Sequence, residues 1–320
     1  MRSLKILCPC EQHITRRSSL SEIREAYGHS HNLYFIKTTA AMMFKSTVSF
    51  ALFALITLIL ATGGSATYGS YDIDDADQLL EQANFLTKVA GESIDSVDQT
   101  VEAVDTQIET VDLVVKKALR EKRSRHGDDG FVDDLMDHAH YLNEVAYVQI
   151  DGADKGIEVI DKIVKDSHDR VESAIEIVEE LLDDDSNNRK LKRALKKLDD
   201  AEDAIEEAGE AVEDAENKIE TAGGKIEDAG IEIQESINNG NDIDDIETAD
   251  DAVEKADDAV ENAAVYVEAA EEAIEYADEL IRQANAAVER ANRGRGLRQK
   301  TASGPGSKNQ AASELVDGAA

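Results

Sequence analysis

Four consecutive residues near the middle of the chain match a protease recognition signal. Arg120-Glu121-Lys122-Arg123 fits the Arg-x-Lys-Arg pattern that furin-like convertases cleave. A protease needs an extended and exposed segment, which a loop between helices provides. Basic side chains at a helix C-terminus are also stabilised by the helix dipole, so a helix end is the alternative interpretation. Arg120, Lys122 and Arg123 are therefore predicted to form either a processing site or a basic helix end.

A carboxylate and an imidazole follow this segment at a spacing of four residues. Asp134 and His138 lie on the same face if this part of the chain is helical. Both groups can bind a divalent metal, but a metal site needs three or four converging ligands, and the spacing supplies two. We therefore expect a solvated face here, with weak metal binding as the alternative. The segment that begins at Asp183 does not complete a calcium-binding EF-hand, since Ala194 stands at its twelfth position.

Carboxylates are the most abundant chemical groups of the chain. The 320 residues include 69 Asp and Glu against 34 Lys and Arg, and residues 199–292 alone hold 32 acidic and five basic side chains. Such a surface repels nucleic acid and anionic membranes, so the expected partners are cationic. Neighbouring carboxylates also repel one another, and Ca²⁺ relieves that repulsion. Weak Ca²⁺ binding and plain solvation are the two interpretations of the acidic face.

No catalytic motif accompanies these groups. The sequence contains no glycine-rich phosphate loop and no nucleophile elbow. Its two cysteines, Cys8 and Cys10, stand close to the N-terminus without the Cys-x-x-Cys spacing of redox or zinc motifs. We therefore predict a protein that is not an enzyme and has no resident cofactor.

The acidic side chains are carried on segments with a strict heptad repeat. From Ile246 to Ala291, alternating steps of three and four residues meet Ile or Val and then Ala, without exception. The same repeat of apolar residues occurs three more times along the chain, and each occurrence covers about seven heptads. It predicts helices at about 73–119, 132–182, 191–237 and 246–292. The expected fold is all-α, a long antiparallel four-helix bundle or coiled coil with Ala-rich heptad seams.

The connections favour a bundle formed within one chain. The breaks between the helices are short and rich in Gly, Asn, Asp and Ser, and short connections between equal helices produce antiparallel neighbours. A coiled coil shared among several chains is the alternative. Asn143 is the one amide at a large core position. A buried Asn can fix helix register at a cost in stability, whereas an exposed position at the end of the bundle would have no such role.

The N-terminal part of the chain is predicted to be a targeting segment. Residues 46–62 are uncharged, Lys45 precedes them, and small residues follow up to Ala66. This is the layout of a secretory signal peptide at 42–66, behind an upstream leader at 1–41, with a mature N-terminus near Thr67. The alternative is a single-pass signal anchor that spans the membrane through 46–62. At the other end, residues 293–320 are predicted to form a disordered basic tail.

These features together predict a secreted structural or matrix protein. The expected molecule is a polyanionic helical rod, extracellular or in secretory granules, that binds divalent cations or basic partners and assembles with itself or with other matrix proteins. The alternative is an exchangeable, apolipoprotein-like bundle that binds lipid or another hydrophobic ligand.

Overall fold

The computed structural model describes residues 72–124 and 127–302, with side chains through Arg293. These residues form four α-helices and no strand, so the predicted all-α four-helix bundle is confirmed. The leader, the signal peptide with Ala66 and the uncharged run at 46–62 lie outside the described residues. The helices are α2 (Ile73–Lys122), α3 (Asp129–Asp184), α4 (Arg189–Asn238) and α5 (Ile243–Ala302).

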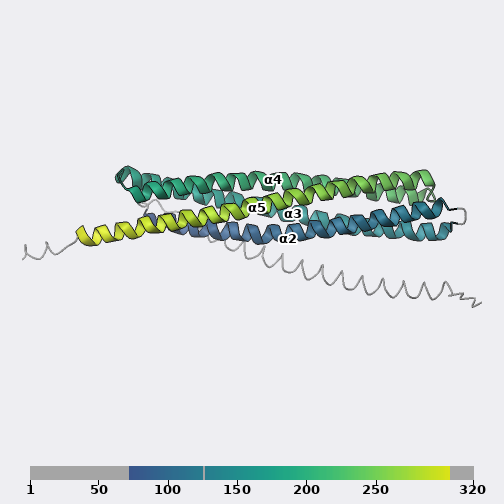
Figure 1. The fold of residues 1–320 in the computed structure, drawn as a ribbon, viewed down its shortest axis with the longest axis horizontal. Helices are drawn as coiled ribbons and strands as arrows, with labels where there is room; N and C mark the ends of the chain where they lie inside the picture. Colours follow the sequence, from purple (N-terminus) through teal and green to yellow (C-terminus); the bar gives the residue numbers. More distant parts are fainter. Residues whose placement is uncertain (1–71, 125–126, 303–320) are drawn as a thin grey trace, which may run out of the picture. The chain divides into compact units, whose positions relative to one another are not determined.

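The four helices form a ring in which each helix packs against two others. The contacting pairs are α2 with α3, α3 with α4, α4 with α5, and α5 with α2, and the chain runs up and down between them (Figure 1). Backbones approach more closely within the hairpins α2–α3 and α4–α5 than between them. We call the two closer contacts the hairpin interfaces. One chain supplies all four contacting helices, as an intramolecular bundle requires.

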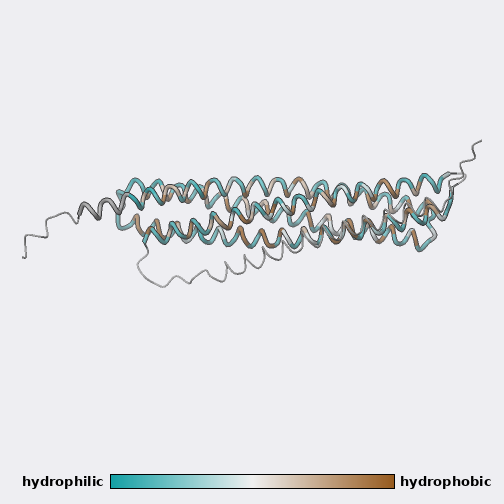
Figure 2. Tube along the Cα trace, turned by 90° about the horizontal axis from the view of Figure 1, so that it is seen from below, coloured by the Kyte–Doolittle hydropathy of each residue, from teal (hydrophilic) through white to brown (hydrophobic). Residues whose placement is uncertain are grey.

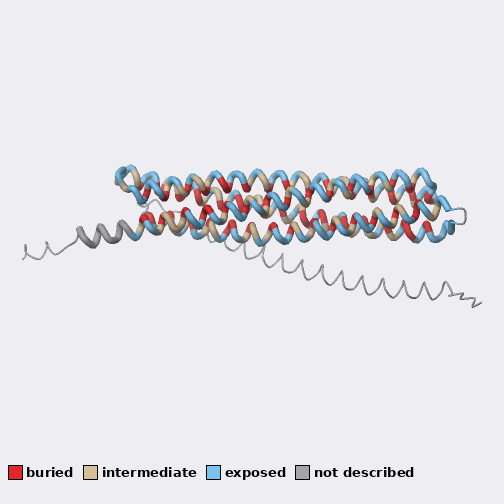
Figure 3. The backbone as a smooth tube through the Cα atoms, in the orientation of Figure 1, coloured by how far each residue is buried: buried red, intermediate tan, exposed pale blue. Residues whose placement is uncertain are grey.

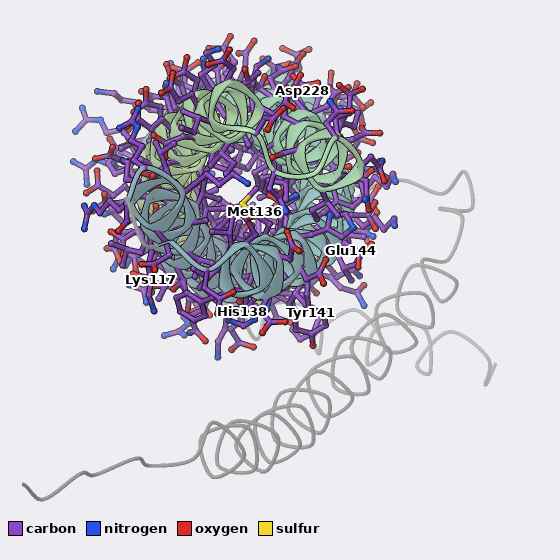
Figure 4. The ribbon with its side chains drawn as sticks, turned by 90° about the vertical axis from the view of Figure 1, so that its right-hand side faces the viewer. Lys117, Met136, His138, Tyr141, Glu144 and Asp228 are labelled. Carbon is purple, nitrogen blue, oxygen red and sulfur yellow. The ribbon has the colours of Figure 1, made fainter. Side chains whose placement is uncertain are left out.

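The core follows the heptad pattern. In each helix the heptad repeat predicts core positions that alternate between a large side chain, mostly Ile, Val or Leu, and a small one, mostly Ala. Every one of these large and small core positions is buried, and the buried residues recur along the inner side of each helix (Figure 3). Hydrophobic residues lie on the same inner side (Figure 2). Viewed along the bundle, Met136 points toward the axis whereas Lys117 and Tyr141 point outward (Figure 4). The polar members of the core are Thr87, Asn143, Ser167 and Ser236.

Side-chain caps set the starts of the helices. Asp72 and Asp75 form a capping box at the start of α2, and Asp128 and Asn188 cap α3 and α4. The turn before α5 contains Asn241, which is buried and has a φ of 56°. An Asn tolerates this left-handed conformation better than most residues. Its Nδ2 donates a hydrogen bond of 2.7 Å to Asp133 Oδ1, which joins the turn to α3.

Helix α5 continues ten residues beyond its predicted end, from 292 to Ala302. The expected disordered tail was therefore placed too early, and residues 303–320 lie outside the described residues. The first proline after the bundle is Pro305, and arginines in a last helical stretch suit the helix dipole, so no residue stops α5 at 292. Among the described residues, no helix combines the length and the apolar character that crossing a membrane requires.

Candidate functional site

The residues that flank the core positions face different neighbours. In α4, Gly209 follows a small core position, and a Cβ placed there would lie 3.8 Å from Val164 of α3. Lys218 precedes a large core position, and its Nζ lies 4.9 Å from the ring centre of Tyr266 in α5. The residue after each small position therefore faces the contact between hairpins, and the residue before each large position faces the hairpin interface.

Carboxylates from two helices face each other where α2 meets α5. Burial raises the pKa of Asp257, and the carboxylates of Asp105, Asp112 and Glu109 on α2 raise it further. The residues that follow small core positions supply this set on both helices. They are Asp77, Asp98, Asp105 and Asp112 on α2, and Asp250, Asp257, Glu271 and Asp278 on α5.

A second group of facing carboxylates lies where α3 meets α4. Burial raises the pKa of Asp154, and Glu158 of the same helix and Glu220 of α4 add to the effect. Burial also raises the pKa of Glu216 on α4, with a further contribution from Asp161 on α3. We call the α2–α5 and α3–α4 contacts the acidic interfaces.

Several oxygens at the α2–α5 acidic interface lack a hydrogen-bond partner among the described residues. The Oδ1 atoms of Asp77, Asp250 and Asp257 are buried in this way, and so are the amide oxygens of Asn84 and Asn285. Buried polar oxygens are normally satisfied, and carboxylate and amide oxygens are the ligands that Ca²⁺ prefers. The interface therefore presents oxygen ligands suited to a hard cation.

The protein places one of its own cations at this interface. Lys116 Nζ lies 2.8 Å from Asp112 Oδ1 and 2.9 Å from Glu254 Oε1, and so connects α2 to α5. Hydrogen bonds to these two carboxylates raise the pKa of Lys116, and Lys116 lowers the pKa of Glu254. A positive charge is thus favourable between these helices.

A different set of potential metal ligands gathers on α3. Ligand atoms of His168, Asp169 and Glu172 lie within 4.8 Å of one another. His168 also lowers the pKa of Glu202 on α4, although burial raises that pKa by more. Among the described residues this group of three does not include Asp134, which is exposed, or His138, which is partly buried. The spacing of four between His168 and Glu172 was the signal available in the sequence.

The convertase motif forms the end of a helix. Arg120 and Lys122 belong to the last turn of α2, and Arg123 is its C-cap with helical dihedral angles. Lys122 Nζ lies 2.9 Å from Asp129 Oδ1, and Arg123 pairs with Glu247 of α5. A protease would have to unfold this turn before it could bind the segment in an extended form. Cleavage after Arg123 stays a prediction.

Asn143 is buried, with 2% of its surface exposed, so it does not occupy a solvated end position. Its Nδ2 donates a hydrogen bond of 2.9 Å to the backbone carbonyl of Ile226 on α4. Gly230 makes room for the amide, because a Cβ there would lie 2.7 Å from Nδ2. These contacts are those expected of a residue that fixes register, although that role itself stays a prediction.

Comparison with protein-family models, with curated proteins and with solved structures finds no match to this chain. The functional argument therefore depends on the geometry of the bundle and its charges.

Proposed function

We propose that this protein is a non-enzymatic structural component of a secreted matrix or granule. In this proposal the bundle is a stiff polyanionic rod whose acidic interfaces bind divalent cations. Bound cations and basic partners then join rods into larger assemblies. The observation that supports the proposal is the facing of carboxylates from two helices along both acidic interfaces. Solubility alone requires acidic side chains on the outer surface, but it does not require them between helices.

The energetic argument concerns repulsion between the carboxylates. Burial and neighbouring carboxylates raise the pKa values of Asp98, Asp154 and Asp257 above the ordinary Asp value of 3.8. These groups therefore destabilise the folded state at neutral pH, where they are charged. A divalent cation that lies between two such helices removes this repulsion. Because the unfolded chain does not hold the carboxylates together, the cation binds the folded state preferentially and stabilises it.

The test compares CaCl₂ and NaCl at matched ionic strength. Thermal unfolding is followed by circular dichroism, and assembly is followed by light scattering. Millimolar Ca²⁺ should raise the melting temperature by about 2–4 °C for each kcal/mol of preferential binding. Scattering at high protein concentration should rise as well. Identical melting and scattering curves in the two salts would leave the acidic face as plain solvation.

Two matched pairs of substitutions test whether the Ca²⁺ response comes from the acidic interfaces. Asp105→Asn with Asp257→Asn removes two charges from the α2–α5 acidic interface, whereas Glu206→Gln with Glu210→Gln removes two from the exposed surface of α4. The first pair should lose more of the Ca²⁺ response than the second. Equal losses would show that total charge, and not the acidic interface, governs the response.

Secretion is tested separately. A eukaryotic host that expresses the whole chain should release a product whose N-terminus, read by mass spectrometry, lies near Thr67. An intact Met1 on a cytosolic product would contradict the secretory part of the proposal. Flotation with neutral lipid vesicles tests the lipid-carrier alternative, which predicts co-migration with the lipid, whereas a matrix rod should stay at the bottom of the gradient.

A further inference from the structure

A basic groove lies at one end of the α4–α5 hairpin, where α4 begins and α5 approaches its end. Its volume is about 510 Å³, and Ala286 and Ala287 contribute small apolar side chains to it. Six of the lining residues are Lys or Arg, and Glu279 is the one carboxylate. The basic residues are Lys192, Arg193, Lys196, Lys197, Arg282 and Arg290.

Most of these cations are not neutralised by the bundle. Among the described residues, Lys192, Arg193, Lys196 and Arg290 form no ion pair. The sequence explains the concentration of charge, because residues 189–197 contain six basic side chains and no acidic one. A cluster of unpaired positive charge in a chain of net charge −35 calls for an acidic partner.

The outer face of α5 carries a stripe that complements the groove. Asp258, Glu261, Glu268 and Glu272 are all exposed and lie on one face at spacings of three, four and seven residues. Val265 lies among them and is 58% exposed, so an apolar side chain stands between the carboxylates. We call these five residues the outer stripe. The outer stripe combines carboxylates with a central apolar side chain, and the groove combines cations with the small apolar side chains of two alanines.

We propose that the groove of one copy binds the outer stripe of a second copy in an antiparallel, two-fold symmetric dimer. The positions of the two surfaces on α5 make this arrangement self-complementary. Val265 and Ala286 are about 32 Å apart along the helix at 1.5 Å per residue. A two-fold axis midway between them places each groove over the other copy's stripe, so that the contact closes on itself.

The same axis aligns opposite charges. It brings Glu261 level with Arg290 and Asp258 level with Arg293 along the helix axes, and it passes beside Tyr276, which is 56% exposed. Two Tyr276 rings would then meet at the axis. The register also opposes Glu272 and Glu279, which have like charges. Within its own chain Glu279 is paired with Arg282, and Arg293 is paired with Glu289. The contact thus matches opposite charges at the two outer pairs and brings together the two Tyr276 rings at the centre, where the exposed Glu275 of each copy also lies beside the axis.

Ionic strength should affect this dimer in two directions. At very low salt, the net negative charges of the two rods repel each other over long distances. At about 0.1 M salt the Debye length is about 10 Å, so the long-range repulsion is screened while the close ion pairs persist. Dimerisation should therefore be strongest near physiological ionic strength and weaken again at about 1 M salt, where the Debye length is about 3 Å. The contact needs no divalent cation and does not depend on the proposed function.

The decisive experiment exchanges charges between the two surfaces. One variant carries Arg282→Glu and Arg290→Glu in the groove, and the other carries Glu261→Arg and Glu268→Arg in the stripe. Each product, purified from cells that express the whole chain, is measured by analytical ultracentrifugation in EDTA at about 0.1 M NaCl. Each variant alone should dimerise at least about tenfold more weakly than the wild type. An equimolar mixture should dimerise again, because both contacts regain opposite charges.

Two controls keep the result specific. Lys155→Glu with Lys162→Glu on α3, and Glu206→Arg with Glu213→Arg on α4, make the same charge changes at exposed positions outside both surfaces and should dimerise like the wild type after allowance for net charge. Circular dichroism confirms that each variant is folded. In a background of Cys8→Ser and Cys10→Ser, Tyr276→Cys should form a disulfide-linked dimer under mild oxidation, and Val265→Cys should not.

Three outcomes would overturn the proposal. They are a wild type that stays monomeric in EDTA at all ionic strengths, a mixture that fails to dimerise, and cross-linking through Val265→Cys but not through Tyr276→Cys. A monomeric wild type that binds heparin through the same cations would assign the groove to an anionic polymer. Because EDTA is present throughout, loss of the Ca²⁺ response affects the proposed function alone.

Discussion

The hairpin interfaces and the acidic interfaces share one heptad core but differ in the residues beside it. In α5, the positions that face α4 hold Ala252, Ala259, Tyr266 and Ala273, whereas those that face α2 include Asp250, Asp257 and Glu271. Alanine at these positions lets the backbones of α4 and α5 approach closely. Carboxylates need water or a counter-ion, so they occupy the wider contacts. The difference teaches that one bundle can combine two close-packed contacts with two that respond to ions.

This contrast predicts which helix contacts respond to pH and to cations. For every carboxyl whose pKa is shifted by a residue on another helix, the two helices are α2 and α5 or α3 and α4. The hairpin interfaces instead contain contacts such as Lys218 over Tyr266, Lys117 over Phe131, and Gln107 with the carbonyl of Leu142. Packing changes should therefore act mainly on the core and the hairpins, and changes of pH or cation mainly on the acidic interfaces.

The largest effect is expected from overpacking the core. Ala263 is fully buried at a small core position of α5, and Ala263→Leu adds three carbons where the backbones leave no room. The substitution should lower the free energy of unfolding by about 1–3 kcal/mol, as measured by urea titration. Ala269→Leu makes the same change at an exposed position of the same helix and should have little effect. Equal stability of the two variants would mean that the small positions do not need alanine.

The fold was largely predictable because a seven-residue repeat specifies which side of each helix is buried. All fourteen core positions of the heptad repeat from Ile246 to Ala291 are buried. The end of α5 was not predictable from that rule, because a helix can continue past the last packed heptad. The acidic interfaces were missed, although the signal was present as an acidic residue after many of the small positions of α2 and α5. Identifying which helix those residues face requires the order of the helices around the ring.

The next prediction separates two glycines one heptad apart at the α3–α4 acidic interface. A Cβ at Gly223 would lie 3.6 Å from Ile150, an ordinary contact, so Gly223→Ala should stabilise the protein by about 0.5–1 kcal/mol through helix propensity. A Cβ at Gly230 would displace the amide of Asn143 and break its buried hydrogen bond. Gly230→Ala should therefore destabilise the protein by about 1 kcal/mol.

The stability of the two glycine variants is measured by urea titration, and their local protection by amide hydrogen exchange. Loss of protection near residue 226 in Gly230→Ala, but not in Gly223→Ala, would locate the effect at Asn143. Stabilisation by both substitutions would show that Asn143 does not fix the contact between α3 and α4.

A smaller effect is expected from acid. The pKa values of Asp257 and Glu271 are raised by burial and by carboxylates on α2, so their protonation is easier in the folded state than in the unfolded state. Stability should therefore rise as the pH falls through these folded pKa values toward the ordinary values of 3.8 for Asp and 4.5 for Glu. Glu254 and Glu279 have lowered pKa values and oppose the trend, but more of the described carboxyls have a raised pKa than a lowered one.

Melting temperatures between pH 7 and pH 5 test this expectation. Asp257→Asn should melt higher than the wild type at pH 7 and gain less on acidification, because the substitution removes one of the repelling charges. Glu206→Gln, on the exposed surface, should keep the acid response of the wild type. A wild type that loses stability steadily below pH 7 would contradict the assignment of repulsion to the acidic interfaces.

The smallest and most specific effect concerns Lys116, the cation that already bridges α2 and α5. Lys116→Gln removes the charge that lies between Asp112 and Glu254 and leaves their carboxylates facing each other. Because the pair is close to the surface, the melting temperature without divalent cations should fall by only about 1 °C. The same variant should gain more from Ca²⁺ than the wild type does, since a metal ion can then occupy the position of the ammonium group. Lys155→Gln removes an exposed lysine that pairs with Asp151 within α3 and should leave the Ca²⁺ response unchanged. If Lys116→Gln and Lys155→Gln respond alike, cations act on the rod through general screening, and the distinction between the acidic and the hairpin interfaces loses its functional meaning.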